Sequence, residues 1–399
     1  MSIRNNFICF IAFALPLSKQ LVPPLIILTL ILWLFEGKLK EKIQAAKATY
    51  ILPAISFYLL HLLGMIYTSD LKAGGFDLEQ KLTLVMLPLL FLTKQDFNKV
   101  LFHQILKSFV FGAVLAGIIC VTNALVKYYF SNEIDSFFYS QFSAIMHASY
   151  FAMYLNFAII ILLFTEGVLK NTVVKIVILL FLIALIVLIS SKSGVLSLVL
   201  ILLSKFTNDI FINKRYIKAV AMFFVLVTST FAVYFLFPKS FERLSEMNHA
   251  INSSTTELNT TTTRIAIWKH AAKIISKHYL LGVGTGDVKD ALKAEYNKQS
   301  ETQLIENQLN AHNQYLQTCI ALGLPGILVL LSSLIAIGYL TVTNKLVDGA
   351  LLTLIIAFNL LFESMLETQS GVVFISFFLT LYFKLAITDL KSKNSIIAK

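Results

Sequence analysis

Long apolar runs separated by short polar segments dominate this chain, as in the stretch KIVILLFLIALIVLI. A membrane crossing needs about 20 mostly apolar residues, and the strands of a membrane barrel would alternate apolar and polar residues. Because the runs are continuous, they predict membrane-spanning helices, about twelve in all. We therefore expect an all-α polytopic membrane protein. The predicted spans lie near residues 6–18, 21–36, 49–67, 81–93, 105–128, 148–165, 173–189, 193–206, 216–237, 313–340, 346–365 and 370–388.

One polar stretch, residues 238–312, is the only long hydrophilic segment. It separates residues 1–237, with nine predicted spans, from residues 313–399, with three spans and a polar tail. Ionisable residues that gather where a solvated loop re-enters the bilayer indicate a functional site. We therefore expect the chemistry of this protein at this loop, which holds four of the seven histidines: His249, His270, His278 and His312.

The placement of lysine and arginine predicts the orientation of the spans. Basic residues favour the cytoplasmic side, and they gather in the loops that follow the even-numbered spans. With a cytoplasmic N-terminus, the partly helical loop between spans nine and ten then lies outside the cytoplasm. The cytoplasmic set comprises Lys38, Lys40, Lys42, Lys47, Lys94, Lys99, Lys170, Lys175, Lys205, Lys214, Arg215, Lys218 and Lys345, with Lys391, Lys393 and Lys399 in the C-terminal tail.

Composition agrees with a membrane protein and removes other classes. Only 14% of the residues are charged, against roughly 25% in soluble domains. The net charge of +11 does not indicate nucleic acid, because the basic residues lie in short loops between spans. Cys9, Cys120 and Cys319 lie in apolar segments, and the spacing of the loop histidines fits no compact ligand pattern. We expect neither a metal nor another cofactor.

The polar loop has its own pattern. Apolar residues recur at helical spacing from Arg264 to Lys277, which predicts an amphipathic helix that could lie on the bilayer surface. GVGTGD follows it. No strand precedes these glycines and no Gly-Lys-Ser/Thr follows, which favours a tight turn between two helices over a phosphate-binding loop. Asp287 is expected to cap the second helix.

Several ionisable residues are candidates for the site. Arg264 begins the predicted amphipathic helix, where a cation opposes the helix dipole, and this indicates an anionic partner. Lys192 lies in the very short turn LISSKSGVLS between two spans. It is either an ion site or a lysine that snorkels to the bilayer edge. Both residues are expected on the outer side, where they can meet His312.

Other polar residues near the outer side carry weaker signals. His147 starts the sixth span, and Asn313 follows His312 at the membrane boundary. Glu363, Glu367 and Gln369 surround the turn between the last two spans. For His147 and the two glutamates, local pattern favours a structural or interfacial role over a catalytic one.

Together these residues form a pattern that resembles the O-antigen ligase and polymerase family. The topology resembles that family over nearly the whole chain, and the specific motifs fall roughly within residues 180–330. They are an Arg-x-x-x-Trp helix, a Leu-Gly-x-Gly-x-Gly turn, a His-Asn-x-Tyr-Leu-Gln segment and a Gly-x-x-Gly in the following span. In this chain they are Arg264, Trp268, Leu281, Gly282, Gly284, Gly286, His312, Asn313, Tyr315, Leu316, Gln317, Gly323 and Gly326.

The resemblance implies a GT-C-like fold in the bacterial inner membrane, with the active site facing the periplasm. It implies a metal-independent glycosyltransferase that moves a glycan from undecaprenyl diphosphate to a hydroxyl of lipid A–core or a similar acceptor. A polymerase that joins lipid-linked repeat units would use the same donor and stays open as an alternative. A flippase or transporter is disfavoured, because the spans divide nine to three and the candidate charges gather at one face.

The resemblance also implies residue roles. His312 and Arg264 are the expected catalytic residues, with His312 either accepting the acceptor's proton or contacting a phosphate. Arg264 suits bidentate phosphate contact. The family often has an arginine where this chain has Lys192. The lysine keeps the charge but lacks the paired N–H donors of a guanidinium. The expected contacts to diphosphate or glycan are Lys192, Arg264, Asn313, Tyr315 and His147.

Overall fold

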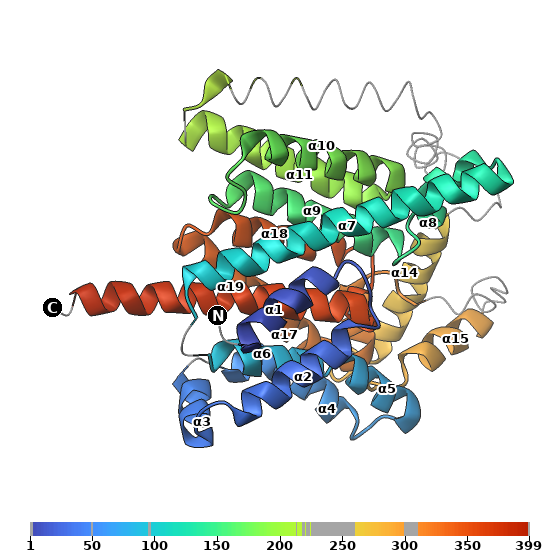
Figure 1. Ribbon diagram of the computed structural model, residues 1–399. Coiled ribbons are helices and arrows are strands. Elements are labelled where there is room, and N and C mark those ends of the chain that lie inside the picture. Colours follow the sequence, from blue (N-terminus) through green and yellow to red (C-terminus); the bar gives the residue numbers. More distant parts are fainter. Residues whose placement is uncertain are drawn as a thin grey trace. The chain divides into compact units, whose positions relative to one another are not determined.

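The computed structural model in Figure 1 describes residues 3–48, 51–94, 97–212, 214–217, 220, 224, 260–298 and 310–397. Within these ranges all regular secondary structure is helical, which confirms the all-α class. The chain forms two compact units. Unit 1 contains Asn5–Val22 and His103–Thr255, and unit 2 contains Ser2–Arg4, Pro23–Phe102 and Thr256–Lys399.

Unit 1 is built around helix α9, whose residues from Ala148 to Leu162 are all buried. Helices α10 and α11 pack against it. Small residues let the helices approach closely: a Cβ on Gly194 would lie 2.4 Å from Cβ of Ala152. The helices that lie wholly or mainly in this unit are α1 (Ile3–Ala14), α7 (Lys99–Ser131), η1 (Ile134–Phe137), α8 (Tyr139–Phe142), α9 (Ala148–Phe164), α10 (Thr172–Ile189), α11 (Lys192–Thr207) and η2 (Asn208–Ile212).

Unit 2 is built around helix α19, which is buried from Val372 to Tyr382. Helices α6, α17 and α18 pack against it. The helices of unit 2 are α2 (Val22–Phe35), α3 (Leu39–Ala48), α4 (Ile51–Gly64), α5 (Leu71–Lys81), α6 (Thr83–Leu92), α14 (Thr260–Lys277), α15 (Val288–Lys298), α17 (Gln314–Thr343), α18 (Val347–Asn359), η3 (Met365–Glu367) and α19 (Gln369–Ile397).

Five helices in the described part of the chain are long and apolar enough to cross a membrane, and a bent pair, Val22–Phe35 with Lys40–Ala46, is a sixth candidate. The chain is therefore a multi-pass membrane protein. Each predicted span except 216–237 coincides with a helix, and 216–237 lies largely outside the described residues. Some helices are short: α6 has 10 residues, or about 15 Å of the roughly 30 Å hydrocarbon core. Twelve crossings stay a prediction.

Helix α17 is broken at Gly323, a feature that its continuous apolar run does not predict. Gly323 has φ of 59° and ψ of −147°, and Pro325 follows within the helix. The carbonyls of Ile320 and Ala321 instead accept hydrogen bonds from the backbone N–H groups of Val283 and Gly284, at 2.8 and 3.0 Å. The glycine-rich segment is thus a tight turn between two helices, as predicted, and it docks into this break.

The amphipathic pattern of α14 is confirmed, but the expectation that its apolar face lies on the bilayer surface is wrong. Ile267, Ala271 and Ile274 are buried in one cluster with residues of α15 and α17. The helix begins at Thr260, before Arg264. Asp287 precedes α15, but its carboxylate accepts from the backbone N–H groups of residues 69 and 70. Packing within unit 2 therefore fixes α14 beside α17.

Candidate active site

The buried carboxylate of Glu363 joins the two residues expected to be catalytic. Arg264 Nη2 donates to Glu363 Oε1 at 2.7 Å. His312 Nδ1 lies 3.3 Å from Glu363 Oε2. The Glu363 side chain is 7% exposed, whereas those of Arg264 and His312 are 30% and 27% exposed. The acid therefore lies beneath two basic groups that remain accessible.

Helix α14 brings both residues of the Arg-x-x-x-Trp motif to this site. Residues four apart lie on one face of a helix. Trp268 accordingly follows Arg264 by one turn, and its indole N–H donates to the carbonyl of Ala311 at 3.0 Å. The anionic partner that the placement of Arg264 indicated is thus Glu363 of the same chain. Helix-end electrostatics do not explain it, because α14 begins before Arg264.

His312 is held in an unusual backbone conformation. Its φ is 44°, in the left-handed region that costs free energy for residues other than glycine. Neighbouring side chains hold the segment in place: the His312 N–H donates to Asn310 Oδ1 at 2.9 Å, and the Ala311 N–H donates to Gln317 Oε1 at 3.3 Å. Such strain occurs at functional sites, where it fixes a side chain.

Asn313 and Tyr315 have structural contacts in this region. Asn313 caps α17, because its Oδ1 accepts from the N–H of Leu316 at 3.1 Å. The Tyr315 hydroxyl donates to the carbonyl of Ala357 at 2.8 Å. These contacts account for both residues locally, and their contact with substrate stays a prediction.

Glu363 is the residue of the site that sequence reasoning undervalued. It follows α18 in the turn before α19, and its N–H donates to the carbonyl of Asn359 at 3.1 Å. The signal in the sequence is charge balance: Arg264 and His312 are expected at one membrane face, and an acid in a turn on that face is a natural partner for them.

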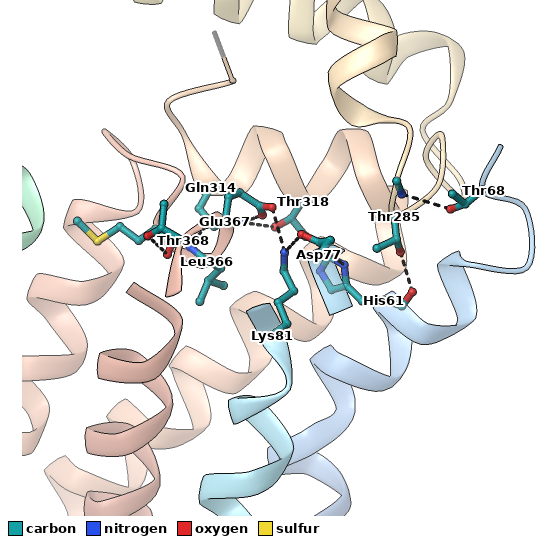
Figure 2. A network of polar contacts seen from close by, with 12 residues as sticks. His61, Thr68, Asp77, Lys81, Thr285, Gln314, Thr318, Leu366, Glu367 and Thr368 are labelled. Carbon is teal, nitrogen blue, oxygen red and sulfur yellow. Dashed lines mark hydrogen bonds and ion pairs between the residues drawn. The ribbon is translucent and has the colours of Figure 1, made fainter. Parts of the chain in front are cut away.

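A second polar cluster lies in unit 2 (Figure 2). It adjoins this site in the sequence, because Gln314 follows His312 and Glu367 follows Glu363 within a few residues. It contains Lys81 and Asp77 of α5, Glu367 of η3 and Gln314 of α17. Burial raises the pKa of the Glu367 carboxyl; Lys81 opposes this rise, and the second carboxylate, Asp77, adds to it. Among the described residues, His, Cys, Asp and Glu form no group of three that could hold a metal ion.

An apolar cavity of about 340 Å³ lies between α4, α6, α17 and α19 of unit 2. Leu360 and Leu366, which flank Glu363 in the sequence, are among its lining residues. The lining also includes Phe57, Ala336 and Leu379. The cavity therefore reaches the turn that carries Glu363.

Lys192 and His147 belong to unit 1. Lys192 is the first residue of α11, directly after a turn in which Ser190 has a left-handed φ of 51° and Ser191 caps the helix. This confirms the very short connection between the two helices. His147 precedes α9, is exposed, and has its ring 5.8 Å from that of Tyr150. That Lys192 meets Arg264 and His312 stays a prediction.

Residues 176–331 match a family model described as O-Antigen ligase. This part of the chain belongs to the O-antigen ligase family. The O-antigen ligase domain contains Lys192, Arg264, His312, Asn313 and Tyr315, and Glu363 lies beyond the matched residues. A search of curated proteins found no match to the chain. The family match supports a membrane protein of the O-antigen ligase or polymerase type, with glycosyltransferase-like activity on a lipid-linked glycan and an acceptor.

Proposed function

We propose that this protein is an O-antigen ligase-type glycosyltransferase that moves a glycan from undecaprenyl diphosphate to a hydroxyl of lipid A–core or a similar acceptor. The observation that carries this proposal is the Glu363 carboxylate between Arg264 and His312. It combines a group that can handle a proton with a cation that can bind phosphate, which are the two functions that the reaction needs.

His312 is the proposed base. When Nδ1 carries its proton and donates it to Glu363, Nε2 remains to accept a proton from the acceptor. Glu363 would fix this tautomer and stabilise the imidazolium that forms. The same arrangement of base and orienting carboxylate recurs in enzymes that activate hydroxyl groups.

Arg264 is the proposed contact to the leaving group. A guanidinium has five N–H donors, so the hydrogen bond to Glu363 leaves others for the diphosphate. In the proposed step the acceptor oxygen attacks the anomeric carbon with inversion, and its proton passes to His312. The bond from that carbon to the diphosphate oxygen breaks, and undecaprenyl diphosphate leaves with the electron pair. Arg264, and Lys192 as a second cation, would stabilise the charge that develops there.

The proposed setting is the bacterial inner membrane, with twelve crossings and a cytoplasmic N-terminus. The segments are residues 1–237, a periplasmic loop 238–312, and residues 313–399, and the site faces the periplasm. The position of basic residues supports this orientation. The apolar cavity supports a lipid-linked donor, because it would take the isoprenoid chain below a diphosphate held at Arg264.

A transfer assay with purified protein in liposomes tests the proposal. The assay supplies a defined undecaprenyl-diphosphate-linked glycan and lipid A–core, without ATP. We expect transfer to the core by the wild type, and loss of transfer in His312→Ala and Arg264→Ala while both variants still insert into the membrane. Retained activity would remove that residue from the site.

The same assay separates the alternatives. A ligase leaves the lipid-linked glycan unextended when lipid A–core is omitted, whereas a polymerase still extends it. Movement of the donor across the bilayer without any transfer would contradict the glycosyltransferase and support a flippase.

A further inference from the structure

The buried ionic cluster of Lys81, Asp77 and Glu367 lies in unit 2 next to the segments that carry the site. Lys81 is the last residue of α5 and its side chain is 0% exposed. Its ammonium contacts Asp77, one turn earlier, and Glu367 Oε2 at 3.0 Å. Burying charged groups costs free energy, and apolar residues of similar volume often give equal or greater stability. Stability alone is therefore a weak reason for this cluster.

Gln314 links the cluster to the turn that follows α18. Its side-chain Nε2 donates to Glu367 Oε1 at 2.9 Å, and its Oε1 accepts from the Leu366 N–H at 2.7 Å. Its backbone N–H donates to the carbonyl of Leu360 at 2.8 Å. The start of α17 is thus bonded at three points to residues 360–367, as Figure 2 shows for the two side-chain contacts.

These two bonded segments carry two groups of the proposed site. His312 lies two residues before Gln314, and Glu363 lies between Leu360 and Leu366. The distance of 3.3 Å between His312 Nδ1 and Glu363 Oε2 depends on how the segments are aligned. A displacement of about 1 Å would take the pair out of hydrogen-bonding range and can cost about 100-fold in rate.

We propose that Lys81, Glu367 and Gln314 are positioning residues that hold the Glu363 carboxylate beside His312. Lys81 fixes Glu367, Glu367 and the Leu366 N–H fix Gln314, and the turn between Leu360 and Leu366 then presents Glu363. None of the three contacts a reacting atom in the proposed step. The inference rests on the proposed function, because the pair that they align is the proposed base and its orienting acid.

The test measures transfer by Gln314→Met and Glu367→Gln in liposomes. Gln314→Met keeps the size and removes the side-chain hydrogen bonds to Glu367 and Leu366, together with the one to Thr318 Oγ1 within α17. Glu367→Gln removes one charge. We expect kcat to fall by about 10- to 100-fold while KM for the lipid-linked donor stays within about twofold, because Arg264 still binds the donor. The double variant Gln314→Glu/Glu367→Gln exchanges the two side chains and should recover kcat relative to Gln314→Glu alone.

Asp209→Asn is the matched control. Asp209 is 3% exposed and accepts from Lys205 at 2.8 Å, in a buried ion pair of unit 1. Gln314→Met and Glu367→Gln should lower the thermal unfolding midpoint, because each breaks buried polar contacts. Asp209→Asn should lower the midpoint in the same way but keep a wild-type kcat.

Two results would overturn the positioning role: a folded Gln314→Met with wild-type kcat, or a Gln314→Met that does not fold, which makes the cluster merely structural. These are distinct from failure of the proposed function. If the wild type transfers glycan and His312→Ala does not, a fully active Gln314→Met contradicts only the positioning. If the wild type transfers nothing, the proposed function itself is wrong.

Discussion

Arg264 and Glu363 lie 99 residues apart in the chain, and their side chains meet at 2.7 Å. The carboxylate is nearly buried while the guanidinium is partly exposed. Removing one partner of such a pair leaves the other charge without compensation. Glu363 also contacts His312, so it connects the accessible cation to the proposed base. Substitution of Glu363 is therefore the most direct test of the site.

Glu363→Gln should lower kcat by about 10²- to 10⁴-fold, the usual contribution of a positioned acid–base group. The amide keeps the size of the side chain but no longer stabilises an imidazolium on His312. The measurement is transfer kcat in liposomes, with Glu79→Gln, an exposed acid on α5, as control. A Glu363→Gln protein as active as that control would show that the carboxylate has no part in the reaction.

Lys192→Arg should retain more transfer than Lys192→Ala if Lys192 binds the diphosphate. A hydrogen bond to a charged group contributes about 1.5–3 kcal/mol, so the alanine variant should lose about 10- to 100-fold in kcat/KM. Lys170→Ala, at an exposed position before α10, is the control. Equal activity of both Lys192 variants would make this residue a snorkelling lysine.

Gly282→Ala should destabilise unit 2 by about 1–3 kcal/mol or more, because an alanine would be strained in this backbone conformation and its Cβ would have no space. Its φ is 75°, and a Cβ there would lie 2.4 Å from the Ala321 carbonyl oxygen. The check is the thermal unfolding midpoint in detergent. Gly75→Ala is the matched control, because nothing lies within 4 Å of a Cβ there. Gly75 is a helical glycine, so Gly75→Ala should raise the free energy of unfolding by roughly 0.5–1 kcal/mol. Equal midpoints for the two variants would argue against the docked turn.

The sequence predicts most of the helices because an apolar run is a local property. The same holds for the turn after α14, whose glycines stand between two helical patterns. The break in α17 was not predictable in this way. Gly323 and Pro325 mark a weak point, but the N–H groups that satisfy the freed carbonyls come from Val283 and Gly284, about 40 residues earlier in the chain.

The site was predictable in part for a similar reason. Arg264 and His312 stand out locally, as ionisable residues in motifs at the edge of a polar loop. Glu363 does not, because an acid in an outer turn is usually interfacial. Its significance depends on a long-range contact with Arg264 that no local pattern carries. The same applies to Lys81, which adjoins an apolar run and reaches Glu367 across 286 residues.

The stability that the contact between α14 and α15 contributes should depend on pH, because Glu295 titrates there. Burial alone would raise the pKa of its carboxyl, but the hydrogen bond from Lys298 and the charges of Lys277 and Lys273 outweigh burial, so the pKa lies below its ordinary value. Such a carboxylate stabilises the fold above the unfolded-state pKa of about 4.3, and this contribution is lost as pH falls through the folded-state value.

Glu295→Gln should accordingly lower the unfolding midpoint slightly at pH 7. Its difference from the wild type should shrink as pH falls below about 4.3. The lysine partners are largely exposed, so the effect should be no more than about 1 kcal/mol. A difference that stays constant from neutral to acidic pH would contradict this assignment.

Filling the apolar cavity should impair use of the lipid-linked donor. Ala336 lines the cavity from α17, whereas its neighbour Ile335 is not among the lining residues. An indole at residue 336 would occupy part of the roughly 340 Å³, and an indole at residue 335 would project away from it. If the isoprenoid chain lies there, Ala336→Trp should raise KM for the donor by about tenfold or more, since one lost methylene contact is already worth about 0.8 kcal/mol. The Ile335→Trp variant should bind the donor as the wild type does.

Measuring KM with donors of long and short isoprenoid chains sharpens the comparison, because a shortened chain should be insensitive to Ala336→Trp. Equal donor KM values for the two tryptophan variants would place the chain outside this cavity.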